Sequence, residues 1–247
     1  MNVRAFTLLE MMIVMLIVAA LAAGLAMPLA AQVQLRRLED ARRLLDVSRE
    51  ALLGFAATHG RLPCPASEAS RGEESFMPGG DGANGLCERF HEGYLPAAAL
   101  GLAPLDDAGL LRAAGPLPAH RVRYAVFGGH VNEVANALTR ANGIQAAGLP
   151  AIGNAPHLLL VCASGTGTGP SSCGLAANQL TRRAAFVLVA PGPGALGPAA
   201  AGSDAERNLD GDLVFVTHEM TPTFDHLVTW APVNVLASRL LASGRLP

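Results

Sequence analysis

The sequence predicts an α+β fold, in which one long N-terminal helix packs on a head with an antiparallel β-sheet and disulfides. Three observations predict it. An uncharged run of twenty-one residues, Met11–Ala31, continues into a charged segment with helical periodicity. The rest of the 247-residue chain offers short β-like runs joined by loops, with helical segments to one side. Four cysteines are enough for two disulfides.

The composition argues against one class of function. The chain is 51% hydrophobic and only 15% charged, whereas an ordinary soluble domain carries about 25% charge. Its net charge is −2 and aromatic residues make up 4%. Proteins that bind nucleic acid usually show a basic surplus with stacking aromatics. We therefore expect no stable nucleic-acid partner.

The run Met11–Ala31 is long enough to cross a membrane. At about 1.5 Å per residue, a helix of this length measures roughly 30 Å, the thickness of the hydrocarbon core of a bilayer. A cleaved secretory signal has a shorter apolar core of about 7–15 residues, while a plain signal anchor fits the length. We expect the first half of the helix, about residues 11–31, to be transmembrane.

Glu10 stands at the beginning of this apolar stretch. A carboxylate at bilayer depth costs about 2.5–3.5 kcal/mol and is expected to have a partner. In one interpretation, Glu10 simply reaches the polar interface. In the other, the chain is cut after Ala5, and the new amine of Phe6 pairs with Glu10 of a neighbouring subunit in a helical bundle.

The segment Arg4–Glu10 (RAFTLLE) and the apolar run after it resemble the class III signal of type IV prepilins and type II secretion pseudopilins. The resemblance implies a leader of residues 1–5, which prepilin peptidase removes between Ala5 and Phe6 before methylating the Phe6 amine. It also implies that Glu10 serves assembly into a filament. Ala5 stands where the family usually has Gly, so we expect slower cleavage.

Helical periodicity continues after the apolar run, and we predict one helix over residues 6–59. The helix face expected to point to solvent carries charges of both signs at spacings that allow pairing. His59-Gly60 is typical of the end of a helix. The face expected to pack on the head repeats every three or four residues. It comprises Leu38, Ala41, Leu45, Ser48, Leu52 and Phe55.

The head is predicted over residues 60–247, with Pro191–Ala201 as an exposed loop. Two short helices are expected, Asn132–Ala141 and Asn234–Ser243, the second capped by Asn234. The predicted strands are Val122–Phe127, His157–Ala163, Ala185–Ala190, Leu213–Thr217 and His226–Trp230.

The cysteines are Cys64, Cys87, Cys162 and Cys173. In an oxidising compartment they form two disulfides, with three possible pairings. We expect Cys64–Cys87 and Cys162–Cys173, because sequence neighbours close the smaller loops, and each bridge contributes about 3 kcal/mol. Zinc is the alternative, but the spacing lacks C-x2-C and a nearby His pair.

No catalytic arrangement is apparent, and we expect neither enzymatic activity nor a cofactor. Gly165–Gly169 is glycine-rich but lacks the lysine of a phosphate loop. His218-Glu219 and Asp225-His226 supply acid and base groups without a nucleophile. Asp210 and Asp212 are weak calcium candidates, because some pseudopilins bind calcium and the surrounding turn offers oxygen ligands.

A second, weaker resemblance covers more of the chain. Gly60–Pro65 (GRLPCP), Gly93–Pro96 (GYLP), Arg123–Val126 (RYAV) and Asp225–Trp230 (DHLVTW) are similar to a recurring pattern in uncharacterised pilin-like proteins of Gram-negative bacteria. The size of the head within that pattern indicates a minor subunit.

Together these features predict a structural subunit of a type IV pilus-like filament, a minor pilin. Its expected partners are prepilin peptidase, other pilins and the inner membrane, which it crosses once with the head in the periplasm. The alternatives are a minor pseudopilin of a type II secretion system and, in another class, a membrane-anchored periplasmic enzyme or binding module.

Overall fold

The computed structural model describes residues 8–155, 158–195, 197 and 199–246, and at residues 22–31 it describes the backbone only. The chain divides into two compact units, residues 1–40 and residues 41–247. Helix α1 (Leu8–His59) belongs to both. It ends at His59 and is followed by Gly60, whose φ of 68° is rarely adopted by residues with a Cβ. The Gly60 N–H donates to the carbonyl of Ala56 at 2.8 Å.

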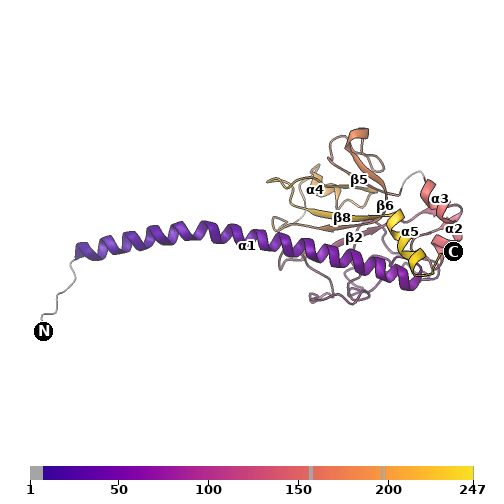
Figure 1. Cartoon of the computed structure of the whole chain (residues 1–247), viewed down its shortest axis with the longest axis horizontal. Helices are drawn as coiled ribbons and strands as arrows, with labels where there is room; N and C mark the ends of the chain where they lie inside the picture. The colour runs from indigo at the N-terminus through magenta and orange to yellow at the C-terminus, as the bar shows by residue number, and fades with distance from the viewer. Residues whose placement is uncertain (1–7, 156–157, 196, 198, 247) are drawn as a thin grey trace. The chain divides into compact units, whose positions relative to one another are not determined.

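In the second unit, α1 runs along the β-sheet and contributes one face to the core (Figure 1). Ala41, Leu45 and Leu52 are buried at the predicted helical spacing. Ser48 lies in the same row with no exposed surface, and its hydroxyl donates to the carbonyl of Leu44 at 2.7 Å. A buried hydroxyl is tolerated there because its hydrogen bond is made within the helix.

The main sheet has six strands among the described residues, in the order β1-β2-β6-β5-β7, with β8 also pairing with β6. The central strand is β6 (Gln179–Ala190), and its residues 185–190 are buried. The other strands are β1 (Gly93–Tyr94), β2 (Arg123–Val126), β5 (Leu159–Cys162), β7 (Val214–Val216) and β8 (Leu227–Pro232).

The expectation of a purely antiparallel sheet is wrong in one place. β5 and β7 are parallel, with Val161 opposite Phe215, whereas the other strand pairs are antiparallel. The reason is the connection: after β6 the chain passes through α4 (Asp204–Arg207) before it enters β7. A long crossover allows parallel neighbours, whereas a tight hairpin turn does not.

The helix expected over Asn132–Ala141 is also wrong. The chain there forms a small hairpin of β3 (His130–Val131) and β4 (Val134–Ala135), followed by turns. Asn132, Glu133 and Asn136 have positive φ values of 48°, 63° and 52°, which a right-handed helix does not accept. Short helices follow instead, α2 (Gly143–Ala147) and α3 (Leu149–Asn154).

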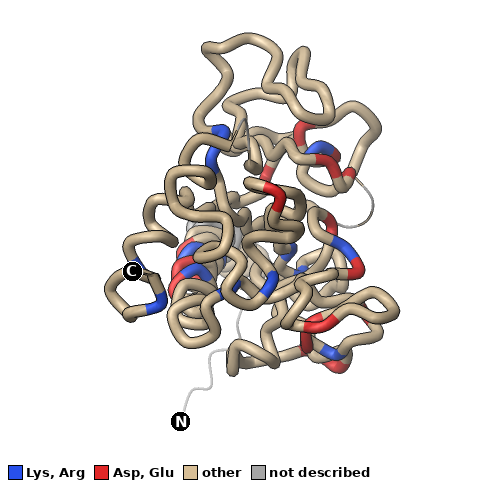
Figure 2. The backbone as a smooth tube through the Cα atoms, turned by 90° about the vertical axis from the view of Figure 1, so that its right-hand side faces the viewer, with Lys and Arg blue, Asp and Glu red and all other residues tan. Residues whose placement is uncertain are grey.

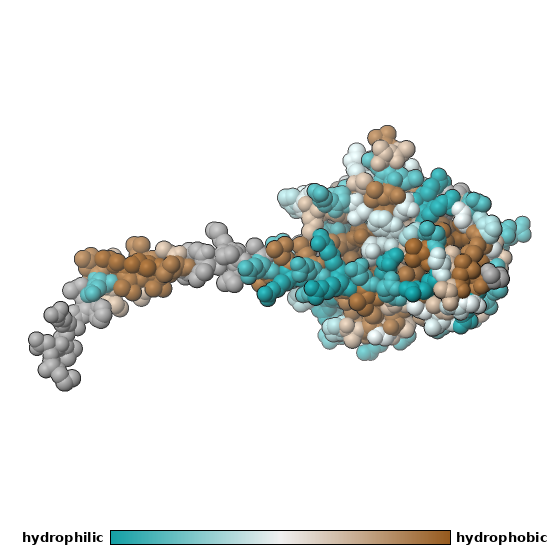
Figure 3. Space-filling view, viewed as in Figure 1, coloured by the Kyte–Doolittle hydropathy of each residue, from teal (hydrophilic) through white to brown (hydrophobic). Residues whose placement is uncertain are grey.

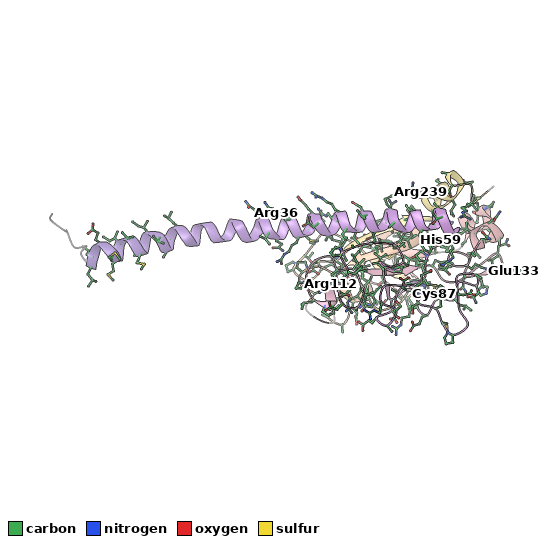
Figure 4. The ribbon with its side chains drawn as sticks, turned by 90° about the horizontal axis from the view of Figure 1, so that it is seen from below. Arg36, His59, Cys87, Arg112, Glu133 and Arg239 are labelled. Atoms are coloured by element: carbon green, nitrogen blue, oxygen red, sulfur yellow. A yellow bond between two sulfur atoms is a disulfide. The ribbon has the colours of Figure 1, made fainter. Side chains whose placement is uncertain are left out.

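The C-terminal helix α5 (Val233–Ala242) begins directly after β8, one residue before the predicted start. Pro232 occupies the N-cap position, so the expectation that Asn234 caps this helix is wrong. Val233, Leu236 and Leu240 bury one face of α5. Arg239 of α5, labelled in Figure 4, forms an ion pair with Glu50 of α1.

Candidate functional site

The cleavage and methylation positions predicted from the sequence, Ala5 and Phe6, lie outside the described residues. Glu10 lies in the first turn of α1 and is exposed. Around it, the large apolar side chains from Leu8 to Leu21 are between 47% and 84% exposed. Figure 3 shows this hydrophobic surface in brown at the N-terminal part of α1.

The exposed apolar surface surrounds the helix on all sides. The eight consecutive residues 11–18 are all large hydrophobics, and each is at least 47% exposed. Eight residues make more than two helical turns, so they cover the full circumference. Between residues 8 and 246, with the undescribed side chains left out, no helix reaches the length and hydropathy of a membrane crossing.

The four cysteines, all among the described residues, form the disulfides Cys64–Cys87 and Cys162–Cys173, the pairing expected from the sequence. The first closes a loop of little regular structure that a buried ion pair also holds. Both Nη atoms of Arg61 donate to the Glu74 carboxylate, at 2.6 and 2.8 Å. Such a bidentate, charge-assisted pair fixes the loop geometry.

Asp210 and Asp212, the calcium candidates, form ion pairs and hydrogen bonds within the turn before β7. Arg207 lies 3.3 Å from Asp210 and 3.8 Å from Asp212. The Asp212 carboxylate also accepts the Val214 N–H at 2.7 Å. Burial, together with the neighbouring charge of Asp210, raises the pKa of Asp212 to about 6. Among the described residues, no group of three or more His, Cys, Asp or Glu side chains could hold a metal ion.

The two histidine motifs lie close to each other, because the Phe224 ring contacts both His218 and His226. His218 Nε2 is 3.0 Å from Asp204 Oδ2, and its ring packs on Phe224 with centroids 4.0 Å apart. His226 is 4% exposed, and Asn208 Nδ2 lies 3.3 Å from its Nδ1. Burial lowers the pKa of His226 to about 4, Arg123 adds to the decrease and Asp225 opposes it. His226 is therefore neutral at pH 7.

Sequence reasoning missed a cleft of about 890 Å³ at one end of the sheet. Its walls come from segments far apart in the chain, including Tyr94, Arg123, Glu206 and His226. Described residues of the loop predicted to be exposed, 191–201, form part of the wall, and Pro191 and Gly192 among them are buried. No local motif could have indicated the cleft, because its walls form only when segments far apart in the chain come together.

Charges of both signs are interspersed over the head (Figure 2). The arginine positions marked there therefore do not gather into one broad basic area of the kind that holds a phosphate backbone.

The family model described as the prokaryotic N-terminal methylation motif matches residues 1–26. No curated protein and no solved structure matches the chain significantly. The match covers the segment that carries Ala5, Phe6 and Glu10 and the first turns of α1. Residues 1–26 are the class III prepilin signal, the N-terminal methylation motif of type IV pilins and pseudopilins.

Proposed function

We propose that the chain is a minor subunit of a type IV pilus-like filament, with a structural role. The precursor is held in the inner membrane by residues 11–31, with the head in the periplasm. Prepilin peptidase cuts it between Ala5 and Phe6 and methylates Phe6. The matured helix then leaves the lipid and packs among the helices of other pilins. The methylation motif supports the processing steps.

One observation carries the assembly step: the apolar surface on all sides of α1 between residues 8 and 21. Burying apolar surface gains about 25 cal/mol per Å², so a helix apolar on every side is stable only when it is fully surrounded. Lipid surrounds it in the precursor, and a bundle of equivalent helices surrounds it in a filament. A subunit that moves between these two environments needs this pattern.

Glu10 gives the bundle its register. A carboxylate within an apolar bundle is expensive unless a positive charge compensates it. Cleavage after Ala5 creates such a charge at the Phe6 amine, four residues before Glu10. We propose that Glu10 of an entering subunit pairs with the Phe6 amine of its neighbour.

The variant Glu10→Ala tests this assignment. It should insert in the membrane as well as the native chain, because removing a charge from an apolar segment favours insertion. It should be absent, or reduced at least about tenfold, in sheared filaments, measured by immunoblotting of filament and membrane fractions. Glu39→Ala is the matched control, since Glu39 is an exposed acid on the same helix.

Normal incorporation of Glu10→Ala would contradict the pairing. Indifference to Glu10, combined with activity or ligand capture by the head, would favour a membrane-anchored periplasmic enzyme or binding module. The alternative of a minor pseudopilin uses the same motif. Deleting the gene separates the two filament types: loss of surface filaments indicates a pilus, and loss of protein export indicates type II secretion.

A further inference from the structure

The cleft at the end of the sheet has the size of a ligand site. Its volume of about 890 Å³ falls within the range of roughly 300–1,000 Å³ that small-molecule sites occupy. It lies within the unit of residues 41–247. Much of its wall is small and apolar, contributed by Pro118, Ala119, Pro191, Ala195, Ala199 and Leu209.

The register of the sheet places a cation in this cleft. Arg123 pairs with Tyr94 on one side and with Val189 on the other, and Val189 pairs with Val228. Directly paired residues share one face of a sheet, and the Arg123 guanidinium accordingly lies 4.2 Å above the Tyr94 ring. Arg123 Nη1 donates to the carbonyl of Glu92 at 3.3 Å. Among the described residues, no carboxylate forms an ion pair with Arg123.

His226 adds a neutral donor next to this cation. The side chain of Asn208 is oriented by Val216, because its Oδ1 accepts the Val216 N–H at 2.7 Å and its Nδ2 donates to the Val216 carbonyl at 3.0 Å. Asn208 Nδ2 therefore donates to His226 Nδ1, and the ring proton must be on Nε2.

The Nε2–H of His226 is available to a ligand. His226 is one of the residues that line the cleft, whereas Asn208, which holds the Nδ1 side of its ring, is not. Two other histidines, His91 and His120, have a fully buried Nε2 without a hydrogen-bond partner, and His226 does not share this state. Its Nε2 therefore keeps contact with solvent, although the residue is only 4% exposed. Among the described residues, no group hydrogen-bonds to this Nε2. A nine-tenths buried donor is thus left open toward the cleft.

The acidic residues of the cleft are committed to other partners. Asp225 Oδ2 accepts the Gly194 N–H at 2.7 Å, and a Cβ on Gly194 would lie 2.8 Å from the same oxygen. Glu206 accepts the Gly202 N–H, and Asp210 pairs with Arg207. These carboxylates hold the walls in place, whereas Arg123 and His226 have donors to spare.

We propose that this cleft binds a carboxylate carried on a small apolar body. Arg123 supplies the positive charge, the Nε2–H of His226 donates to one carboxylate oxygen, and the proline- and alanine-rich wall covers the apolar part. A guanidinium and a neutral N–H suit a carboxylate because both act only as donors. The carboxylate comes either from a free acid or from the C-terminus of a peptide.

Titration of the full-length chain in lipid nanodiscs tests the proposal. Four probes are used: hexanoate, hexanamide, the tripeptide acetyl-Ala-Ala-Leu with a free carboxylate, and the same tripeptide as its C-terminal amide. Binding is followed by NMR of nitrogen-labelled histidine, where the Nε2 signal of His226 reports the contact. A carboxylate probe should bind with a Kd below about 1 mM and at least about tenfold more tightly than its amide.

Arg123→Gln should weaken carboxylate binding at least about tenfold and leave the weak amide binding unchanged. Arg182→Gln is the matched control, because it removes an exposed arginine of the same sheet that does not line the cleft. His226→Gln keeps an N–H donor and should bind more tightly than His226→Phe. If His226→Phe fails to fold, the binding measured for Arg123→Gln decides whether the proposal holds. That variant should fold, since Arg123 is only half-buried and forms no ion pair with the described residues.

Equal binding of acid and amide would overturn the proposal, as would a Kd unaffected by Arg123→Gln, or no binding of either carboxylate. Binding of hexanoate at least as tightly as the tripeptide assigns the site to free acids. Binding of the tripeptide alone assigns it to a chain terminus. None of these outcomes depends on filament assembly, so the site and the proposed function can fail separately.

Discussion

The two ends of helix α1 differ in how their apolar residues are arranged and exposed. Residues 41–59 of α1 bury an apolar row every three or four positions, and Leu52 in that row has no exposed surface. Residues 8–21 are apolar at nearly every position, and Leu16 there is 72% exposed. A periodic apolar row is typical of a helix that packs on one side against its own chain. A helix that is apolar at every position is typical of one that is surrounded by apolar material on all sides. Residues 41–59 are covered by the head, whereas the apolar side chains of residues 8–21 stay exposed among the described residues.

The largest effect should separate the two stretches directly. Leu52→Ala removes a fully buried side chain and should lower the free energy of unfolding by about 3 kcal/mol. Leu16→Ala should change it by less than about 0.5 kcal/mol. Chemical unfolding of the full chain in detergent measures both, with the single tryptophan, Trp230 of β8, reporting on the head. Equal effects would break the comparison.

An effect of similar total size comes from pH, and it should act only on the head. The pKa of His226 falls from 6.5 to about 4 on folding. As the pH is lowered, the unfolded chain therefore binds a proton at this side chain before the folded chain does. Stability contributed by neutral His226 is complete above pH 6.5 and declines as the pH falls toward 4, by about 3 kcal/mol in all. His226→Gln should remove this decline when the free energy of unfolding is measured between pH 4 and 7.

Asp212 works in the opposite direction over much of the same range. Its folded pKa of about 6 lies above the usual 3.8, so the folded chain holds a proton that the unfolded chain has lost. Asp212→Asn should therefore make the acid destabilisation steeper, whereas His226→Gln makes it shallower. Two variants with the same slope would show that other groups control the pH dependence.

The smallest effect is expected between α5 and α1. The ion pair of Arg239 with Glu50 joins side chains that are 46% and 54% exposed, and exposed pairs contribute little. Arg239→Ala should cost no more than about 0.5 kcal/mol, and the same loss should appear in high salt for the native chain. A loss comparable to that of Leu52→Ala would mean that charge, and not apolar packing, holds this part of α1 to the head.

Local patterns predicted the features that depend on neighbours in sequence. The helical period, the stop at Gly60 and the buried half of β6 can be read directly, because side-chain spacing determines which face is covered. The first half of β6, Gln179–Arg183, was missed because Leu180 is its only apolar residue. The helix expected at 132–141 failed because asparagines adopt left-handed backbone easily, which composition does not reveal.

The candidate sites divide in the same way. The N-terminal motif is contiguous, so the sequence alone indicates Ala5, Phe6 and Glu10. The cleft brings together Tyr94, Arg123 and His226 only after β1, β2 and β8 have paired around the end of β6. Such a site depends on sheet register, which a single sequence does not determine.

Mass spectrometry of the mature N-terminus tests the central claim most directly. The chain is purified from native membranes of cells with and without prepilin peptidase. Filament assembly predicts a chain that begins at methylated Phe6, and only when the peptidase is present. It also predicts that Ala5→Gly increases the processed fraction, since Gly is the residue usual at that position in the family. A chain that keeps Met1, or one cut near Ala31, would contradict the account.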